Sequence, residues 1–190
     1  MKTFKEIVAE TVKNLKNGKT ILYPTDTIWG LGCDATNAKA IEKIYKIKQR
    51  PESKSLIVLL DSFDRLRDYV KVIPPFTQEL IESVENPLSI IYPGAKNIAK
   101  NIIPENGSVC IRITSNKFCQ EIIRQLGKPI TSTSANISGE KSPLIFEQVS
   151  ETIKQEVDYI VELEQDVLHK VKASTIIKIE IDGSYKIIRP

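Results

Sequence analysis

Hydrophobic residues in the N-terminal part of the chain recur with the periodicity of helices. Over residues 4–15, apolar positions follow one another at intervals of three and four, and Thr3 with Glu6 has the spacing of a capping box. A second run begins after Asn37 and is expected to end before Pro51, because a residue that precedes proline resists the helical conformation. The pattern therefore predicts two amphipathic helices before the first long apolar run.

Short apolar runs elsewhere have the length and composition of strands. The run at residues 56–60 is uninterrupted, which is typical of a strand buried on both faces. Further strands are predicted at residues 20–23, 88–92, 108–113, 130–133, 160–163, 175–179 and 185–188. Further helices are predicted at residues 61–69, capped by Asp61, after Pro74-Pro75, at 115–126, capped by Ser115 and closed by Gly127, and at 146–157. This order predicts an α/β (α+β) fold, a mixed sheet with helices packed on it.

Composition narrows the class of protein. A chain of 190 residues with 41% apolar and 27% charged residues fits one globular domain, and a net charge of +3 is too weak to indicate nucleic-acid binding by itself. Cys33, Cys110 and Cys119 have no CxxC spacing, so a reducing compartment fits. The single histidine, His169, argues against a histidine-rich zinc site or a Ser–His relay. With no signal core or membrane-spanning run in the sequence, we expect a cytoplasmic protein.

Two polar segments follow predicted elements and carry candidate chemistry. Residues 24–32, Pro-Thr-Asp-Thr-Ile-Trp-Gly-Leu-Gly, form either a turn capped by hydroxyls or a place where glycines let the backbone approach a ligand. Past a predicted helix end, Lys48, Arg50 and Lys54 either complement the helix dipole or present cations to a phosphate. Arg50 precedes proline and is therefore extended, so it can point away from the helix into a cleft.

Two further segments suit anionic ligands. Residues 131–139, Thr-Ser-Thr-Ser-Ala-Asn-Ile-Ser-Gly, place hydroxyls and an amide after a predicted strand. Ligands bind at that position in open α/β sheets, although a polar surface turn is the alternative. Arg112 ends the apolar run at 108–112 and, if buried, needs an anion, either a substrate carboxylate or a protein carboxylate. This inventory favours binding and polarising anions over catalysis by a side-chain nucleophile.

Together these motifs resemble those of the YrdC-like family, the threonylcarbamoyl-adenylate synthases. The similar segments, in the family's order, are PTDTIWGLG (24–32), KQR (48–50), KSL (54–56), SVCIR (108–112), STSANISG (132–139), ST (174–175) and IIRP (187–190). The resemblance implies a twisted mixed β-sheet flanked by helices, with a concave, positively charged face, as a single domain over 1–190. It also implies that L-threonine, bicarbonate and ATP give threonylcarbamoyl-AMP and pyrophosphate. A separate tRNA threonylcarbamoyl-transferase complex would then use that product to make threonylcarbamoyladenosine in tRNA.

The resemblance also implies roles for individual residues. Lys48 and Arg50 are expected to be catalytic through the phosphate charge. The expected ATP contacts are Arg50, Lys54, Ser108, Ser134, Asn136, Ser142 and Arg189. The expected threonine contacts are Thr27, Arg112, Ser132 and Ser174, with Arg112 gripping the carboxylate. No protein metal ligand is expected, and Mg²⁺ is expected to arrive on the ATP phosphates. This sequence departs from the family at Leu59, where some members carry a threonine-contacting histidine, and at 95–97, where Ala-Lys-Asn replaces Pro-Leu-Thr.

Two other functions fit the same residues. A basic concave face could bind tRNA or double-stranded RNA without catalysis, although the sequence has no interleaved basic and aromatic stripe. A carbamoyl-transfer domain is the other alternative, and the missing acylphosphatase and zinc-like segments of larger maturation proteins count against it. Carbamoyl phosphate as a substrate would distinguish that alternative from threonylcarbamoyl-AMP synthesis.

Overall fold

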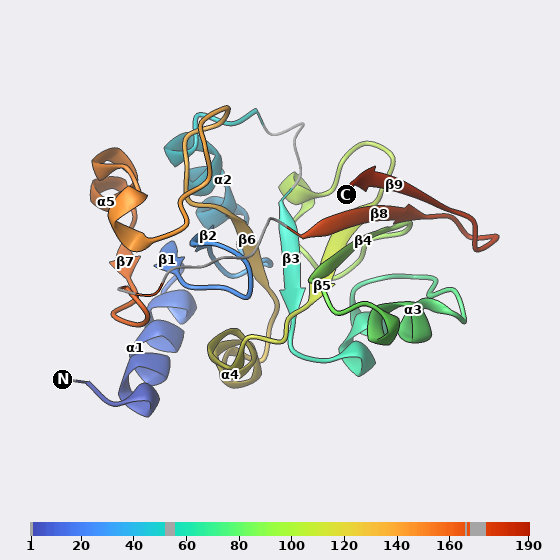
Figure 1. Cartoon of the computed structure of the whole chain (residues 1–190), viewed down its shortest axis with the longest axis horizontal. Coiled ribbons are helices and arrows are strands. Elements are labelled where there is room, and N and C mark those ends of the chain that lie inside the picture. The colour runs from blue at the N-terminus through green and yellow to red at the C-terminus, as the bar shows by residue number, and fades with distance from the viewer. Residues whose placement is uncertain (1, 52–55, 166, 168–173) are drawn as a thin grey trace.

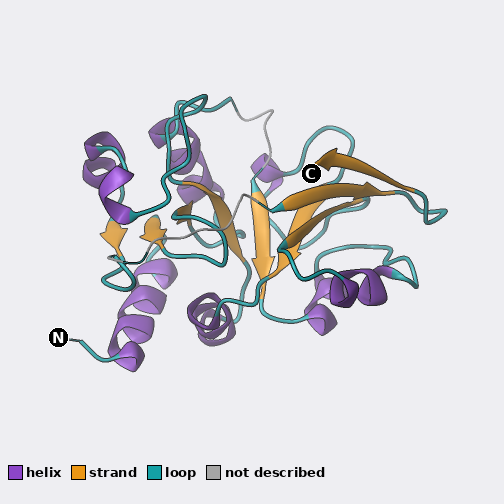
Figure 2. Cartoon of the chain, in the orientation of Figure 1, coloured by secondary structure: helices purple, strands orange, loops and turns teal. Residues whose placement is uncertain are grey.

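The computed structural model describes residues 2–51, 56–165, 167 and 174–190, and within them a nine-stranded sheet carries helices on both faces (Figures 1 and 2). The strands are β1 (Ile21–Tyr23), β2 (Gly30–Gly32), β3 (Ile57–Leu60), β4 (Leu88–Tyr92), β5 (Val109–Ile113), β6 (Ile130–Ser134), β7 (Tyr159–Ile160), β8 (Thr175–Ile179) and β9 (Tyr185–Arg189). Their order is β7-β1-β2-β6-β3-β5-β4-β8-β9. The pairs β1–β7, β3–β5 and β4–β8 are parallel and the others antiparallel, which confirms the predicted mixed sheet.

Local capping explains where the first two helices begin. The helices are α1 (Phe4–Lys16), α2 (Ala38–Ile47), α3 (Thr77–Ser83), α4 (Lys117–Leu126) and α5 (Glu151–Glu156), with short 3₁₀ turns η1 (Phe63–Asp68), η2 (Lys100–Ile102) and η3 (Phe146–Gln148). At α1, Thr3 and Glu6 form the predicted capping box. At α2, the Asn37 side chain accepts hydrogen bonds from two backbone N–H groups of the first turn.

No helix in the described part of the chain has the length and apolar character that a membrane crossing requires.

Three predicted helix boundaries were wrong, for reasons that differ from one helix to the next. Helix α4 is capped by Asn116, whose Oδ1 accepts from Cys119 N at 3.0 Å, and not by Ser115. Asp61 caps no helix, because its carboxylate pairs with Arg65 at 3.0 Å and the following segment forms the 3₁₀ turn η1. The predicted helix at 146–157 is η3 and α5, separated where Val149 is extended and Ser150 caps α5.

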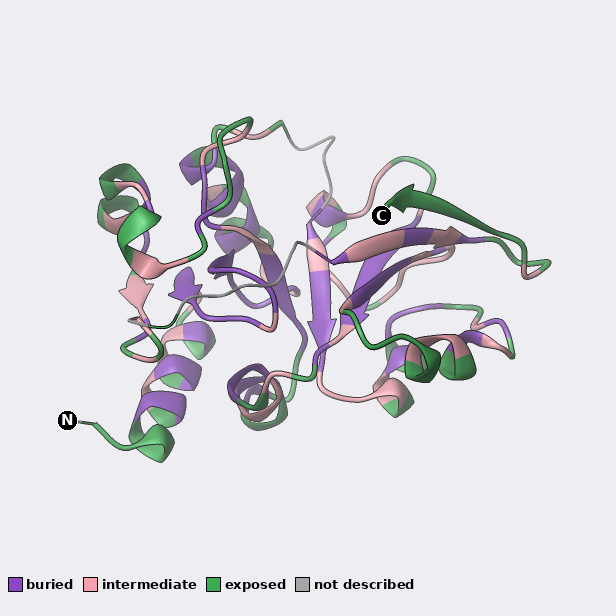
Figure 3. Ribbon diagram, in the orientation of Figure 1, coloured by how far each residue is buried: buried purple, intermediate pink, exposed green. Residues whose placement is uncertain are grey.

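Helices α1 and α4 cover one face of the sheet, and α2 covers the other (Figure 1). Alternation along each strand divides its side chains between the two faces, so Tyr23 and Leu59 pack with α1 and α4. Leu22 and Val58 pack in the core that includes α2. Figure 3 shows the buried centre of the sheet and the exposed edge strand β9. Strand β3 is buried as predicted, whereas β7 covers only two residues, not residues 160–163.

Gly32 lies where β2 pairs with β6, and a side chain does not fit there. We therefore expect Gly32→Ala to destabilise the protein more than Gly107→Ala does. A Cβ at this position would overlap the carbonyl oxygen of Thr131 and lie 2.9 Å from Cε1 of Tyr23. Because that neighbour is backbone, the strands must shift, and we expect a loss of about 3 kcal/mol in the free energy of unfolding, measured by urea denaturation. Gly107→Ala is the control, since its Cβ meets nothing within 4 Å and only its φ of +70° is unfavourable. A loss no larger than that of Gly107→Ala, about 1 kcal/mol, would contradict the steric explanation.

Candidate functional site

A cavity of about 260 Å³ opens on the face of the sheet that carries α1 and α4. It is lined by Thr25, Thr27, Ile28, Trp29, Gly30, Arg50, Leu56, Ile57, Ile91, Cys110, Arg112, Ser132, Thr133, Ser134, Ser142, Ser174, Ile176, Ile188 and Arg189. Strand register explains its floor, because Ser132, Ile57, Cys110 and Ile91 are successive neighbours across β6, β3, β5 and β4. The polar groups come from loops and strand ends around this row.

The loop between β1 and β2 forms one wall of the cavity and is held by threonine hydroxyls. The Thr25 hydroxyl donates to the Ile28 carbonyl at 2.7 Å and accepts from the Thr27 backbone N–H at 3.0 Å. The Thr25 and Thr27 hydroxyl oxygens are 3.0 Å apart. The turn stabilised by hydroxyls is therefore confirmed. The same segment lines the cavity, and the approach of its backbone to a ligand stays a prediction.

Arg112 is buried at the end of β5 and forms an ion pair with Asp26. Its Nη2 lies 3.2 Å from Asp26 Oδ1, and the two side chains are only 3% and 8% exposed. Asp26 Oδ2 also accepts from the Thr114 hydroxyl at 3.2 Å. Of the two anions considered for Arg112, the protein carboxylate is thus present, and the arginine still lines the cavity. Asp26 lies inside the 24–32 motif but was not predicted as a site residue.

Ser174, just before β8, and Arg189 of β9 form a second polar group on the lining. Arg189 donates from Nε and Nη2 to the Ser174 carbonyl at 3.0 and 2.7 Å. The Ser174 hydroxyl lies 2.8 Å from the hydroxyl of Ser89, which is fully buried and was not predicted. Burial lowers the pKa of Arg189, and the nearby Arg112 acts in the same direction. Ser89 has no motif around it, so only the pairing of β4 with β8 identifies it.

The chain between α2 and the cavity turns sharply at Gln49. Its N–H donates to the Lys46 carbonyl and the N–H of Arg50 donates to the Tyr45 carbonyl, both at 3.0 Å, which is a Schellman motif. Gln49 has the φ of +48° that this motif requires and that glycine usually supplies. The turn directs Arg50 into the cavity, and burial lowers the pKa of its guanidinium.

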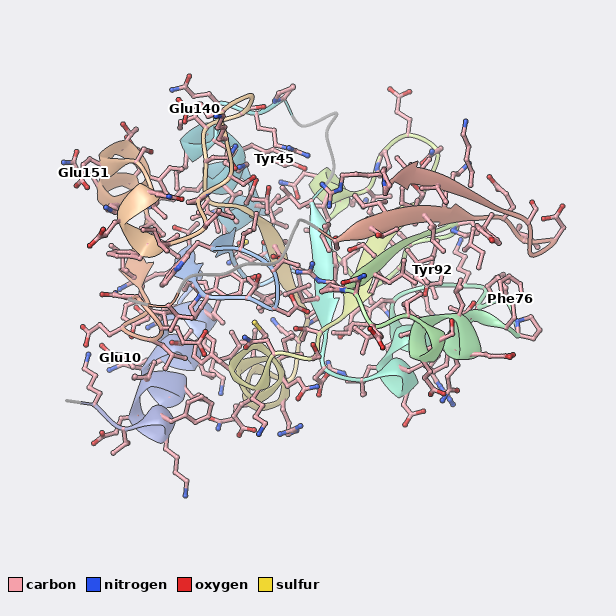
Figure 4. All side chains as sticks on the ribbon, viewed as in Figure 1. Glu10, Tyr45, Phe76, Tyr92, Glu140 and Glu151 are labelled. Atoms are coloured by element: carbon pink, nitrogen blue, oxygen red, sulfur yellow. The ribbon has the colours of Figure 1, made fainter. Side chains whose placement is uncertain are left out.

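The Lys48 side chain takes a different direction from that of Arg50. Its ammonium is buried and donates to the carbonyls of Ser134 and Asn136 at 2.5 and 2.6 Å. Burial, together with the nearby Arg50, lowers the pKa of Lys48 to about 8. The segment that it reaches, residues 134–142, follows β6 and is called the hydroxyl loop below. In Figure 4, Tyr45 of α2 and Glu140 of this loop both lie at the top of the view.

The cavity brings together most of the site residues predicted from the sequence. Those that line it are Thr27, Arg50, Arg112, Ser132, Ser134, Ser142, Ser174 and Arg189. Lys48, Ser108 and Asn136 are buried next to it and do not line it. Lys54 lies outside the described residues. Leu59 is packed in the core with α1 and α4, and residues 95–97 do not line the cavity.

The charges of the cavity suit an anionic ligand. Among its described lining residues there are three arginines and no carboxylate. The Cys110 thiol on the floor is neutral at pH 7, because burial raises its pKa to about 12 despite the opposing effects of Arg112 and Arg189. No cluster of histidine, cysteine or acidic side chains in the described part of the chain could hold a metal ion. The arrangement can bind and polarise anions, as the residue types suggested.

Comparisons with known proteins identify the family of the chain. A family model described as "Telomere recombination" (Sua5, YciO and YrdC) matches residues 13–190. A relative from Pseudoalteromonas translucida named threonylcarbamoyl-AMP synthase is 32% identical over 158 residues, which are 82% of this chain and 84% of that protein. One of the same name from Vibrio campbellii is 33% identical over 157 residues, 80% of this chain and 82% of the relative.

Solved structures share the fold. The crystal structure of P. abyssi Sua5 complexed with L-threonine superposes with a TM-score of 0.88 at 26% identity, and covers 100% of this chain. This chain spans 55% of that protein. E. coli YciO superposes with a TM-score of 0.84 at 22% identity, covering 100% of this chain and 90% of YciO. The expected YrdC-like fold is confirmed, and the chain belongs to the Sua5/YciO/YrdC family.

Proposed function

We propose that this protein is an L-threonylcarbamoyladenylate synthase, which converts L-threonine, bicarbonate and ATP into threonylcarbamoyl-AMP and pyrophosphate. The observation that carries the proposal is the cavity, in which three arginines and several hydroxyls converge, with no carboxylate among the described lining residues. The names of the relatives from P. translucida and V. campbellii support the reaction. The product would pass to a tRNA threonylcarbamoyl-transferase complex for modification of tRNA.

The threonine end of the proposed site lies at the junction of the β1–β2 loop with β5 and β6. Arg112 would bind the threonine carboxylate, with Asp26 fixing the direction of its guanidinium. Thr27, Ser132 and Ser174 would offer hydroxyls to the rest of the amino acid. The L-threonine bound to P. abyssi Sua5 supports a threonine site in this fold.

The ATP end lies toward α2 and the hydroxyl loop. Arg50 would contact the phosphates directly, and its planar fork suits them. The Lys48 ammonium does not line the cavity itself but donates to the carbonyl of Ser134, which does. Ser134, Ser142 and Arg189 would make further ATP contacts from the lining, while Asn136 and Ser108 would act from just outside it. A contact from Lys54 stays a prediction, because that residue lies outside the described ranges.

The proposed reaction needs no protein nucleophile. Bicarbonate joins the threonine amine as a carbamate with loss of water, and a carbamate oxygen attacks the α-phosphorus while the bond to pyrophosphate breaks. Holding both reactants in one cavity removes an entropic barrier of up to about 7–11 kcal/mol in favourable cases. Negative charge grows on the phosphates, where Arg50 would stabilise it. Because a carbamate loses CO₂ in water, a loaded cavity must also exclude solvent.

The expected Mg²⁺ would enter with ATP and not bind to a protein site. Magnesium prefers carboxylate and other oxygen ligands, whereas the described lining offers guanidiniums and hydroxyls without a carboxylate. These residues do not fit a site in which the protein itself holds the ion. Mg²⁺ is therefore treated as part of the ATP substrate.

A direct assay tests the proposal. The protein is incubated with ATP, Mg²⁺, bicarbonate and threonine, and pyrophosphate is measured together with the mass of threonylcarbamoyl-AMP. We expect both products only when threonine and bicarbonate are present. Salt-sensitive binding of RNA without threonine-dependent ATP consumption would favour the RNA-binding alternative. Turnover of carbamoyl phosphate in place of bicarbonate would favour the carbamoyl-transfer alternative.

A further inference from the structure

Lys48 connects two segments that are far apart in the sequence. The residue is only 1% exposed. Its ammonium donates to the carbonyls of Ser134 and Asn136 at 2.5 and 2.6 Å. In the opposite direction, the N–H of Ser138 donates to the Lys48 carbonyl at 2.9 Å. Three hydrogen bonds thus join the C-terminal end of α2 to the hydroxyl loop.

The hydroxyl loop is braced internally at the point where Lys48 attaches. The side-chain amide of Asn136 donates to the carbonyls of Ile137 and Glu140 at 2.9 and 2.8 Å. The N–H of Ala135 donates to the Trp29 carbonyl at 2.9 Å. The loop is therefore held from within by Asn136 and from outside by the residue before β2 and by the end of α2, so a change at Lys48 is expected to move the loop as a unit.

Burial of the ammonium makes this connection costly to break. A charged donor forms stronger hydrogen bonds than a neutral one, and its removal deprives both carbonyls of a donor in a buried place. The neighbouring backbone is also strained, because Gln49 adopts a left-handed conformation without being glycine. Such strain persists only where the surrounding contacts over-determine the geometry, as the three bonds at Lys48 do.

We propose that Lys48 is a positioning residue that fixes the hydroxyl loop against α2, so that Ser134 and Arg50 face one ligand across the cavity. Ser134 and Arg50 both line the cavity, whereas Lys48 does not. This differs from the role that the resemblance implied for Lys48, which was to stabilise the charge of the phosphates together with Arg50. The statement about the ligand rests on the proposed function, whereas the connection between loop and helix does not.

The experiment compares Lys48→Met with Lys39→Met. Methionine keeps most of the length of the side chain and removes the charge and the donors, and Lys39 is exposed on the same helix. Hydrogen exchange of the amides in residues 134–142 is measured in the ligand-free protein, and the affinity for ATP is measured by calorimetry. We expect exchange about tenfold faster or more in the loop of Lys48→Met, with ATP affinity reduced by a similar factor. Lys39→Met should leave both quantities unchanged.

Unchanged exchange of the loop in Lys48→Met, with ATP affinity still reduced, would overturn the proposal and assign Lys48 to the phosphates directly. If Lys48→Met does not fold, the wild-type protein still provides a test through the nitrogen-15 NMR signal of the Lys48 ammonium. We expect slowly exchanging ammonium protons with and without ATP. Loss of that protection on ATP binding would also overturn the proposal. A failed synthesis assay affects neither the exchange data nor the ligand-free spectrum, so the two failures can be told apart.

Discussion

Arg50→Ala is expected to lower threonine-dependent pyrophosphate formation about a hundredfold or more. The guanidinium lines the cavity and follows a turn that directs it there, and burial lowers its pKa. Removing one preorganised group that stabilises developing charge typically costs about 2.7–4 kcal/mol of barrier. Because Arg50 is only half-buried, the free energy of unfolding should change by about 1 kcal/mol or less. Initial rates and urea denaturation of the same preparation check both numbers.

Two variants make the Arg50 result specific. Arg67→Ala removes an exposed arginine from η1, and both turnover and stability should stay at the wild-type level. Arg50→Lys keeps the charge and loses the planar fork, so its rate should lie between those of Arg50→Ala and the wild type. Normal conversion of ATP to pyrophosphate by a folded Arg50→Ala protein would contradict the proposal that Arg50 stabilises the phosphates.

Arg112→Ala is expected to raise the KM for threonine about a hundredfold while the KM for ATP changes little. Removing one partner of a buried charge pair, here Arg112 opposite the threonine carboxylate, costs about 2–5 kcal/mol of binding, and the Arg112 side chain is only 3% exposed. The same change leaves Asp26 without its cation, so the fold should also lose about 3–5 kcal/mol. Steady-state kinetics with each substrate varied in turn separates the two effects.

The double variant Asp26→Asn/Arg112→Ala tests where the loss of stability comes from. Replacing the carboxylate removes the uncompensated charge, so this protein should recover stability relative to Arg112→Ala but not its affinity for threonine. Asp26→Asn alone should raise the KM for threonine by a smaller factor, because the guanidinium keeps its charge and loses its orientation. An equal loss toward ATP and threonine in Arg112→Ala would indicate a purely structural ion pair.

Sequence reasoning succeeded where the determining contacts are local. The capping box at Thr3 and the cap at Asn37 involve residues three or fewer positions away, so the motif contains the whole interaction. It was one residue off at α4, because Ser115 and Asn116 are both good caps and only the tertiary path of the chain selects between them. The break before α5 escaped notice because the apolar residues on either side keep a helical spacing.

The site could be assembled from motifs only in part. The family resemblance pointed to Arg50, Arg112, Ser134 and Ser142, which do line one cavity. It could not reveal the partner of Arg112, since nothing in the sequence relates that residue to Asp26. The direction of Lys48 was equally hidden, because a flexible side chain next to a helix end can reach several places. Contacts such as Arg112–Asp26 and Lys48–Ser134 depend on the order of the strands in the sheet, and the spacing of residues along the chain does not predict that order.

The exposed edge strand β9 has a practical consequence for anyone preparing the protein. All five of its residues are exposed, β8 is its one neighbour among the described strands, and its Arg189 lines the cavity. A purification tag fused after Pro190 would therefore follow an exposed edge strand and begin two residues from an arginine that lines the cavity. Figure 1 shows the N-terminal end of α1 on the far side of the molecule from β9. A tag placed there, and cleaved before assay, leaves the cavity untouched.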